Sequence, residues 1–567
     1  GMFNIGIDFG STYTTVSAYR NETEKLETVV LGLGTPYIPT LVGGKAEQLE
    51  GLRYGSAAKG IMGRKGHVLY KAFKMLLTEK KSELLKERGY TEEITPAVVA
   101  EKFLTDLIQR VLEHYGEKEI DHVVIGAPEI WFKGVDSLSG RSILRNIFEN
   151  MDCVKEVQVV SEPAAASAFF AYNYQTLRNE AYDGHILLID YGGGTLDITL
   201  SRVSAGTDAN GKQFMEINVA DRQGAGENEN GRIGKAGIIY MESLLEEAIR
   251  KAGLLEEDEP LEPDGKFYKA LNELEEEIVN RTTDINSTFE DIGLDYLDEL
   301  EEEEFTVVSY KDEDVEISYA LLVEVYDREI RPVLEENLKK SILYMEEKKI
   351  PYTDPLYEHL KIVLVGGFGN FYLVRKQVQD FFHFCTQDRR QADVIINKSD
   401  CENAISLGTA LLSSGIVGIR HTAPYSVGIL QRNFDGVKYR IDYAIKYRED
   451  LENGKLYYHS KANGEPIPIR LSGNSIRNLV INQEKDDSTA VVLPLQEEFQ
   501  KRLTGVVKNK HNTAAIAFSM DQSDVLTIHI GEYDMLTRKV SEMTPFELAS
   551  FDELFDTAQV IRVIDLE

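Results

Sequence analysis

The chain has 567 residues, which exceeds one ordinary domain and predicts about three or four domains of roughly 150 residues each. Asp and Glu together number 95 and Lys and Arg 62, which gives a formal net charge of −33. An acidic surface repels phosphate, so this balance argues against DNA, RNA or an anionic membrane as a main partner. Apolar residues make up 43% of the chain, which is enough for a large core.

The cysteines and the N-terminus suggest the compartment. Cys153, Cys385 and Cys401 have no metal-binding spacing, and three cysteines do not make a disulfide framework, so we expect reduced thiols. A predicted strand begins at Phe3, with no signal segment before it. No apolar run approaches the roughly 20 residues of a membrane helix. We therefore expect a cytoplasmic protein.

The first part of the chain alternates between predicted strands and helices. Val99, Phe103, Leu107 and Val111 recur at helical spacing, and the region of Lys74 is also predicted as an amphipathic helix. The predicted strands are 3–10, 14–20, 25–32, 122–128 and 154–161. The four apolar residues belong to the predicted helix 95–116, and two more helices are predicted at 139–151 and 164–174.

The same order of elements starts again at His185. A hairpin at 185–203 and a strand at 213–223 come first, and helices, a strand at 359–369 and two more helices follow. This repetition predicts an internal duplication of a whole α/β lobe. The acidic stretch 254–304 is predicted to be helical, either as a solvated subdomain or as a docking surface for a basic partner.

After about Gly418 the sequence changes to short alternating strands between Gly, Asn and Asp turns. This pattern predicts a separate, largely antiparallel β domain. The stretch 543–567 is expected to hold at most a short helix and a terminal strand. The predicted strands of the domain are 425–431, 437–447, 455–460, 467–472, 489–496, 512–521 and 524–533.

Two stretches of the duplicated part are nearly alike, "NIGIDFGSTYTTVS" and "ILLIDYGGGTLDITL". In each, an apolar strand ends in Asp, an aromatic residue and Gly, and small residues lead to another strand. Turns of Gly and hydroxyl residues let backbone N–H groups approach a phosphate closely. Two such turns facing each other would clamp a polyphosphate. The turn residues are Gly10, Ser11, Thr12 and Tyr13 in the first copy, and Gly192, Gly193, Gly194 and Thr195 in the second.

Carboxylates accompany both turns. Asp8 and Asp190 end their strands and would point into the cleft, where Mg²⁺ is usually held by one or two carboxylates, phosphate oxygens and water. We expect these two residues to hold Mg²⁺ mostly through water, with Asp197 as a third carboxylate. Glu162, in "SEPAAA", would orient an attacking water. One such hairpin alone would be an ordinary turn, and neither the protein-kinase nor the P-loop pattern fits.

The order of "GIDFGSTYT", "VVSEPAAASAFFAY", "LLIDYGGGTLDITL", "KIVLVGGFGN" and "ENAISLGTALL" resembles the heat-shock protein 70 (DnaK-type) chaperones. These belong to the ATPase superfamily that also contains actin and sugar kinases, and the resemblance covers roughly the first 420 residues. It implies a duplicated actin-like (ribonuclease H-like), two-lobed α/β ATPase domain, followed by an antiparallel β-sandwich-like domain. The expected boundaries are lobe I at 2–184, lobe II at 185–365 with the acidic subdomain at 235–305, a return to lobe I with a linker at 366–420, and the β domain at 421–567.

The resemblance also implies roles for single residues. Asp8, Asp190 and Asp197 would form the Mg²⁺ environment, and Glu162 would place the hydrolytic water. A catalytic lysine of the first lobe would stabilise charge on the transferred phosphoryl group; Lys74 is chosen, with Lys71 and Lys65 as alternatives. Any of these lysines could instead be an exposed helix cation. The phosphate would lie on residues 10–13 and 192–195, and the adenosine pocket would include Gly366 and Gly367.

The sequence departs from the family at several places. The adenine clamp of the family is a Lys/Arg pair, where "LNELEEEIVN" offers Glu276 and Glu277. Asn370 stands where the family has Arg, and Phe368 could supply stacking. The segment 415–424 replaces the acidic, leucine-rich linker, and the chain ends without room for a helical lid. Base recognition and coupling between the domains are therefore left open.

The leading hypothesis is a chaperone-like ATPase that uses ATP/ADP and Mg²⁺ and couples the nucleotide to polypeptide binding. The stretches 422–430 and 515–530 resemble the peptide-holding β domain of the family, although a domain that only packs or recruits fits as well. A co-chaperone or exchange factor is an expected partner. The alternatives are a nucleotide-sensing scaffold with little turnover and, less favoured, a small-molecule kinase of the same superfamily.

Overall fold

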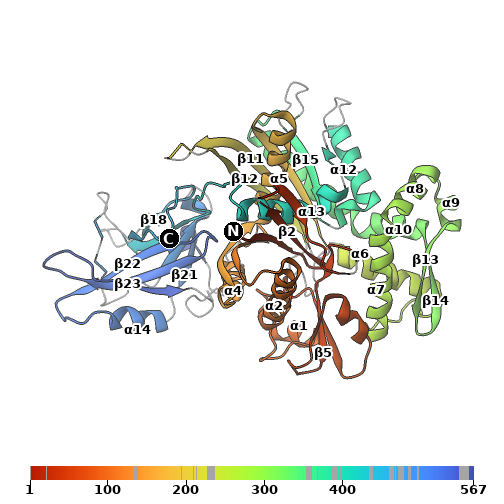
Figure 1. Cartoon of the computed structure of the whole chain (residues 1–567), viewed down its shortest axis with the longest axis horizontal. Coiled ribbons are helices and arrows are strands. Elements are labelled where there is room, and N and C mark those ends of the chain that lie inside the picture. The colour runs from red at the N-terminus through yellow and green to blue at the C-terminus, as the bar shows by residue number, and fades with distance from the viewer. Residues whose placement is uncertain are drawn as a thin grey trace. The chain divides into compact units, whose positions relative to one another are not determined.

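The computed structural model divides the chain into two compact units. The first contains residues 1–126 and 162–419, and the second contains 127–161 and 420–567. Figure 1 shows the elements of both. The structure describes residues 2–20, 22–32, 34–129, 131, 138–192, 195–207, 210–211, 213–225, 237–352, 360–366, 368–385, 394–395, 398–432, 439–458, 465–466, 468–469, 478–482, 487–494, 497–547 and 561–566. The domain boundaries expected from the sequence stay a prediction.

The first sheet of the first unit is built around a buried strand near the N-terminus. Its order is β3-β2-β1-β8, and a short strand β4 pairs with β2. β1 is antiparallel to β2 and parallel to β8. The bounds are β1 (Asn4–Phe9), β2 (Tyr13–Arg20), β3 (Lys25–Thr28), β4 (Ile38–Pro39) and β8 (Ile120–Ala127).

The second sheet repeats this plan. Its order is β12-β11-β10-β15-β16, with β10 antiparallel to β11 and parallel to β15. In both sheets a hairpin therefore precedes a parallel partner strand, which agrees with the repetition in the sequence. The bounds are β10 (Gly184–Tyr191), β11 (Leu196–Thr207), β12 (Gln213–Ala225), β15 (Leu360–Val365) and β16 (Val394–Ile395).

Helices α2 (Pro96–Tyr115), α5 (Glu162–Arg178) and α13 (Lys398–Ser413) belong to this unit. The hydroxyl of Thr95 caps α2 by accepting from the backbone N–H of Val98. The four apolar residues that predicted this helix are all buried, so that prediction is confirmed. α13 packs against α5 so closely that a Cβ added at Gly408 would lie 1.9 Å from the carbonyl oxygen of Ala165.

The region between β4 and α2 differs from the prediction. It contains a small sheet and a 3-10 helix, and Lys74 lies in consecutive turns rather than in a helix. The turns are closed by bonds such as Leu77 N–H to Lys74 O, and Phe73, Lys74 and Leu76 are all buried, so this segment has no polar helix face. The bounds are β5 (Leu41–Lys45), β6 (Arg53–Tyr54), η1 (Gly55–Ile61), β7 (His67–Lys71) and α1 (Ser82–Glu87).

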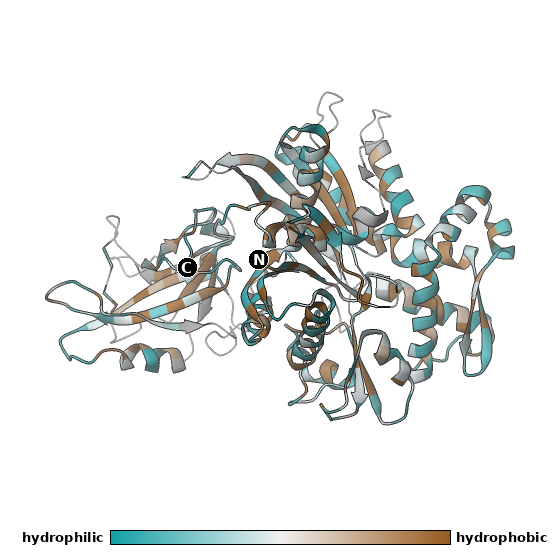
Figure 2. Cartoon of the chain, viewed as in Figure 1, coloured by the Kyte–Doolittle hydropathy of each residue, from teal (hydrophilic) through white to brown (hydrophobic). Residues whose placement is uncertain are grey.

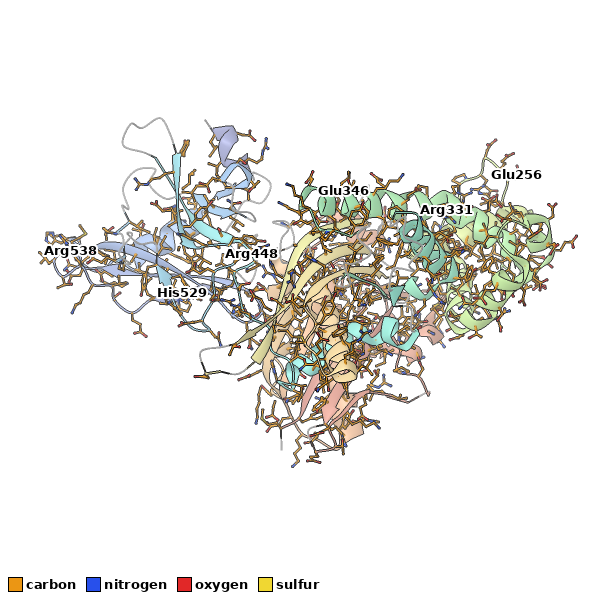
Figure 3. All side chains as sticks on the ribbon, turned by 90° about the horizontal axis from the view of Figure 1, so that it is seen from above. Glu256, Arg331, Glu346, Arg448, His529 and Arg538 are labelled. Carbon is orange, nitrogen blue, oxygen red and sulfur yellow. The ribbon has the colours of Figure 1, made fainter. Side chains whose placement is uncertain are left out.

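The acidic stretch forms amphipathic helices. In α7, Phe267, Leu271, Leu274 and Ile278 are buried in an apolar core of the unit, whereas most acidic side chains of the helix lie outside this core. Figure 2 shows apolar and polar residues alternating along these helices, and Figure 3 shows charged side chains of the region such as Glu256 and Arg331. The bounds are α6 (Gly237–Lys251), α7 (Gly265–Asn280), α8 (Thr282–Ile292), α9 (Leu297–Glu302), β13 (Glu304–Tyr310), β14 (Glu313–Ser318), α10 (Tyr319–Glu329), α11 (Arg331–Glu347) and α12 (Tyr372–Cys385).

The second unit contains two antiparallel sheets, in the orders β18-β17-β20-β21-β25 and β19-β22-β23-β24. Apolar side chains from both sheets form one core, and helix α14 between β21 and β22 was not predicted. The bounds are β17 (Ser426–Arg432), β18 (Tyr439–Ile445), β19 (Tyr457–Tyr458), β20 (Asn478–Asn482), β21 (Val491–Pro494), α14 (Glu497–Gly505), β22 (Thr513–Met520), β23 (Leu526–Tyr533), β24 (Thr544–Glu547) and β25 (Ile561–Arg562).

The segment 127–161 folds as part of this second unit through helix α4 (Leu138–Glu149) and strand β9 (Val154–Ser161). Arg145 of α4 forms an ion pair with Asp521, with 2.7 Å between Nη1 and Oδ2. The backbone N–H of Val159 in β9 donates to Ser523 Oγ at 2.7 Å. The loop between β22 and β23 therefore anchors both elements.

Two expectations about the whole chain can be compared with the structure. Among the described helices, none is both long and apolar enough to cross a bilayer. Cys153 is in no disulfide bond, while the side chains of Cys385 and Cys401 lie outside the described residues.

Candidate functional site

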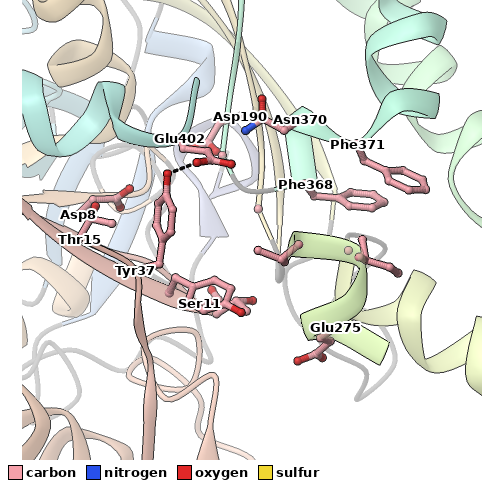
Figure 4. Close-up of a pocket in the computed structure, with 18 of the residues that line it drawn as sticks. Asp8, Ser11, Thr15, Tyr37, Asp190, Glu275, Phe368, Asn370, Phe371 and Glu402 are labelled. Carbon is pink, nitrogen blue, oxygen red and sulfur yellow. Dashed lines mark hydrogen bonds between the residues drawn. The ribbon is translucent and has the colours of Figure 1, made fainter. Parts of the chain in front are cut away.

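A pocket in the first unit brings together the ends of the two repeated hairpins (Figure 4). Gly193, Gly194 and Gly367 lie outside the described residues, and Asp197 is not among the described lining residues. The predicted site residues that line the pocket are Asp8, Gly10, Ser11, Thr12, Tyr13, Lys74, Glu162, Asp190, Gly192, Thr195, Gly366, Phe368 and Asn370.

Glycines allow the backbone to fold tightly around this pocket. A Cβ at Gly10 would lie 2.2 Å from the carbonyl oxygen of Tyr13, so a side chain there would prevent the first turn. Gly366 has φ +87°, and a Cβ there would lie 2.7 Å from Asp190 Oδ1. A residue with a side chain would be strained at this φ and would displace the carboxylate. Gly366 therefore fixes the place of Asp190 as well as the course of its own loop.

Lys74 and Glu162 form a buried ion pair at the charged end of the pocket. Their side chains are 6% and 9% exposed. Burial alone would lower the pKa of Lys74, but the carboxylates of Glu162, Asp8 and Asp190 raise it above its usual value. Lys74 is therefore a permanent cation. Lys65 is exposed and Lys71 does not line the pocket, so Lys74 is the lysine of the three alternatives that the structure places here.

The two strand-ending aspartates lie in the same environment. Burial and the charge of Glu162 raise the pKa of Asp8 to about 7, although Lys74 opposes this shift. Burial, followed by the charges of Glu162, Asp197 and Asp8, raises the pKa of Asp190 well above its usual value. Lys74 alone does not compensate these carboxyl groups, and a cation bound beside them would favour their ionised forms.

This excess of buried negative charge fits Mg²⁺. Asp8 and Asp190 are the residues that would hold it, and phosphate oxygens would share the coordination. In the part of the chain that the structure describes, no three His, Cys, Asp or Glu side chains gather as a direct metal cluster.

Asp197 has a partner that the sequence did not reveal. It lies opposite Asp190 in the β10–β11 ladder and is 5% exposed. Arg222 of β12 binds its Oδ1 through Nη2 at 2.6 Å and through Nε at 2.9 Å. Asp197 is thus a paired carboxylate behind Asp190 whose negative charge still acts on that residue.

Tyr37 and Glu402 also line the pocket and were not predicted as site residues. The hydroxyl of Tyr37 donates a hydrogen bond to Glu402 in α13, as Figure 4 shows. Burial raises the pKa of Glu402 to about 7. The ring of Tyr37 meets Tyr13 edge to face, with 6.2 Å between centroids. The pair therefore supports the first turn from the side of α13. No local pattern could reveal it, because 365 residues separate the two.

The other end of the pocket is apolar. The ring of Phe368 stacks on Phe371 with 5.3 Å between centroids and 14° between planes. Ile278 and Val279 of α7 line the pocket here. The correspondence of Glu276 and Glu277 with the Lys/Arg adenine clamp of the family stays a prediction. Glu276 pairs with Lys59 and Glu277 with Arg281, and neither lines the pocket.

Comparisons with known proteins agree with the resemblance in the sequence, although no model of a protein family matches the chain. A ribosome-associated molecular chaperone of Zygosaccharomyces rouxii is 24% identical over 470 residues, which are 76% of this chain and 66% of that protein. A ribosome-associated molecular chaperone of Saccharomyces cerevisiae is 23% identical over the same shares. The movement protein Hsp70h of Lettuce infectious yellows virus is 23% identical over 39% of each chain.

The chain spans about two thirds, 66%, of the length of the first of these chaperones. The matches to the two yeast proteins extend far beyond the hairpins. Those two relatives are named as molecular chaperones, and the viral protein is named Hsp70h. The predicted resemblance is confirmed: this chain is heat-shock-protein-70-like and strongly diverged from the chaperones that it resembles.

Proposed function

We propose that this protein binds ATP or ADP with Mg²⁺ in the pocket of its first unit, hydrolyses ATP, and couples the nucleotide state to binding of an extended polypeptide. The observation that carries the proposal is the meeting of Asp8 and Asp190, from two copies of one hairpin, beside the buried pair Lys74–Glu162. In this proposal the first unit is a duplicated actin-like ATPase and the second is a β-sandwich-like substrate domain in a cytoplasmic chaperone.

The residues divide the chemistry between them. The turns at 10–13 and 192–195 would hold the phosphates, and Mg²⁺ bound near Asp8 and Asp190 would neutralise their charge. Lys74, always protonated, would stabilise charge that develops on the transferred phosphoryl group. Glu162, oriented by Lys74, would accept a hydrogen bond from the attacking water and hold it in line.

Continuity of the chain supports the coupling. Strand β9 ends at Ser161, and the next residue is Glu162 of the pocket. The loop that holds β9 through Ser523 lies between strands β22 and β23 of the β domain. A shift of Glu162 would thus be transmitted along β9 to that loop, without the acidic linker that the family uses. The proposed coupling would bias two arrangements of the protein by their different nucleotide affinities.

Steady-state phosphate release tests hydrolysis. We expect Glu162→Ala and Asp190→Ala to lower kcat by at least about 100-fold, because each removes a group placed at the reacting phosphate. Glu299→Ala, an exposed carboxylate on α9, is the matched control and should change nothing. Phosphate release that survives both pocket substitutions would contradict the proposal.

Binding of a fluorescent extended peptide tests the coupling. We expect ATP and ADP to give different dissociation rates in the full chain, and Ser523→Ala to reduce that difference while leaving phosphate release unchanged. Equal peptide release in both nucleotides would reject the coupling.

The second candidate is a nucleotide-sensing scaffold with little turnover. The apolar end of the pocket favours it, because Ile278 and Val279 line this end and the sequence offers Glu276 and Glu277 in place of the family's Lys/Arg clamp. It predicts that nucleotide raises the unfolding temperature while phosphate release stays at the level of Glu162→Ala.

A further inference from the structure

We infer that Arg222 is a positioning residue of the pocket, which holds Asp197 away from the bound cation and so keeps the metal site selective for Mg²⁺ over Ca²⁺. This inference rests on the proposed function, since it concerns the cation that would accompany the nucleotide. It is carried by the way in which three neighbouring strands, β10, β11 and β12, place their side chains where the second sheet reaches the pocket.

Asp190 and Asp197 project from the same face of this sheet. They are direct partners in the antiparallel β10–β11 ladder, and such partners have Cβ atoms about 4.5–5.5 Å apart on one face. Figure 4 shows Asp190 among the side chains that line the pocket. After burial and the charge of Glu162, the charge of Asp197 is the next cause that raises the pKa of Asp190. Asp197 is therefore the neighbour of the carboxylate that faces the pocket.

Arg222 reaches Asp197 from the third strand. Gly224 of β12 is the direct partner of Asp197, and Arg222 precedes it by two residues, which places both on the same face. Nε and Nη2 of Arg222 both donate to Asp197 Oδ1, at 2.9 and 2.6 Å. The side chains of Arg222 and Asp197 are 19% and 7% exposed. Asp197 could turn towards a cation only by losing two charge-assisted hydrogen bonds in a mostly buried place.

Gly224 makes room for this ion pair. A Cβ at this position would lie 2.8 Å from Arg222 Nη2 and 2.7 Å from the carbonyl oxygen of Leu196. A side chain opposite Asp197 would therefore push the guanidinium away from the carboxylate. The strand lacks a side chain at the place where Arg222 crosses to Asp197, so the pair is a built feature of the sheet rather than a chance contact of its surface.

The number of available carboxylates decides which divalent cation such a site prefers. Mg²⁺ is usually bound through one or two carboxylates and keeps several waters, whereas Ca²⁺ takes roughly six to eight oxygen ligands and gains affinity from further carboxylates. Lys74 and Arg222 each engage one carboxylate, Glu162 and Asp197, which leaves Asp8 and Asp190 for the cation. Loss of Arg222 would release a third carboxylate beside Asp190 and shift the preference towards Ca²⁺.

Isothermal titration of the full chain with ADP tests this inference without a measurement of turnover. For each protein, the Kd of ADP is determined with EDTA, with Mg²⁺ and with Ca²⁺, and the gain in affinity over EDTA reports what each cation contributes. The affinity of each cation for free ADP is common to all the proteins and cancels between them. We expect Mg²⁺ to give the larger gain in the wild type. In Arg222→Ala, the ratio of the Ca²⁺ gain to the Mg²⁺ gain should rise by about tenfold, because the charge count of the ligands tunes Ca²⁺ affinity.

Three further variants separate the release of Asp197 from a general loss of structure. Asp197→Asn should leave the ratio of the two gains unchanged, because the inference gives Asp197 no contact with the cation. Arg222→Ala/Asp197→Asn should return the ratio to the wild-type value, since no carboxylate is released. Arg202→Ala is the matched control, because its ion pair with Asp183 lies on the same sheet and is exposed.

Two results would overturn the inference and leave the proposed function standing. If Arg222→Ala binds ADP more weakly with EDTA, Mg²⁺ and Ca²⁺ alike and keeps the wild-type ratio, the arginine has only a structural role. If Asp197→Asn alone changes the ratio, Asp197 already contacts the cation in the wild type, and this result does not depend on the stability of Arg222→Ala. Failure of the wild type to bind ADP under all three conditions overturns both the inference and the proposed function.

Discussion

The two hairpins of the first unit have the same course but different surroundings. Asp8 lies opposite Thr15 in its ladder, whereas Asp190 lies opposite Asp197, whose charge Arg222 compensates. A side-chain pair, Tyr37–Glu402, supports the first turn. At the second turn, the backbone N–H of Gly237 donates to the carbonyl of Gly192 at 3.3 Å. The duplication thus preserved the carboxylate that faces the pocket and let the support behind it diverge.

Arg222→Ala should give the largest effect, because it leaves Asp197 buried without its partner. We expect the free energy of unfolding to fall by about 3 kcal/mol, as measured by urea denaturation. Arg202→Ala is the control, since its ion pair with Asp183 on the same sheet is exposed and should contribute less than about 1 kcal/mol.

The double variant Arg222→Ala/Asp197→Asn sharpens this test. Removing the stranded charge should return a large part of the lost stability. If the double variant is as unstable as Arg222→Ala, the arginine acts through packing, and the second hairpin does not depend on a compensated charge.

These differences also show which features could not be predicted from the sequence. Strands β1 and β10 were predictable because each is a largely apolar run that leads into Asp, an aromatic residue and Gly, and β2 and β11 because each follows such a turn as the second strand of a hairpin. Arg222 was not, because it stands in an ordinary strand 25 residues from its partner. Nor did the sequence show which side of α7 faces the pocket: Ile278 and Val279 line it, whereas Glu276 and Glu277 pair with Lys59 and Arg281.

The same limit explains the Lys74 segment. Its residues are buried on all sides, and an apolar period cannot distinguish a helix from consecutive turns there. Lys74 itself was found through the resemblance, not through the predicted helix. The site thus follows from the repeated motif, and its supports follow only from contacts between distant segments.

The support of the first turn can be titrated, unlike that of the second. Burial raises the pKa of Glu402 from its ordinary 4.5 to about 7, so the folded protein holds this proton more tightly than the unfolded chain. The stabilisation is complete below about pH 4.5 and is lost as the pH rises to about 7. We expect Glu402→Gln to remove this loss. Relative to the wild type, the urea midpoint of the variant should therefore be higher at pH 8 than it is at pH 5.

Tyr37→Phe separates the hydrogen bond from the charge. It should leave the pH dependence in place and lower stability by about 1 kcal/mol at either pH. Glu299→Gln, on exposed α9, serves as the control. An unchanged pH profile in Glu402→Gln would mean that this carboxyl does not titrate between the folded and unfolded states.

The smallest effect is expected opposite Asp8. Thr15 is 3% exposed, and its hydroxyl has no hydrogen-bond partner among the described residues. Thr15→Val should therefore leave the free energy of unfolding unchanged or raise it by up to about 1 kcal/mol. Its neighbour Thr14 shares a buried hydrogen bond with Thr40 at 2.8 Å, so Thr14→Val should cost about 1–3 kcal/mol in the same urea experiment.

The two valine variants compare a hydroxyl that has a protein partner with one that lines the pocket and has none among the described residues. If the two variants lose equal stability, the hydroxyl of Thr15 is hydrogen-bonded to water in the pocket. The buried polar group of the first hairpin then has a partner, as Asp197 of the second hairpin has in Arg222. If Thr15→Val keeps its stability but binds ATP more weakly, the hydroxyl of Thr15 contacts the ligand. Thr15, opposite Asp8 in the first hairpin, then contributes directly to ATP binding, whereas Asp197, opposite Asp190 in the second, is paired with Arg222.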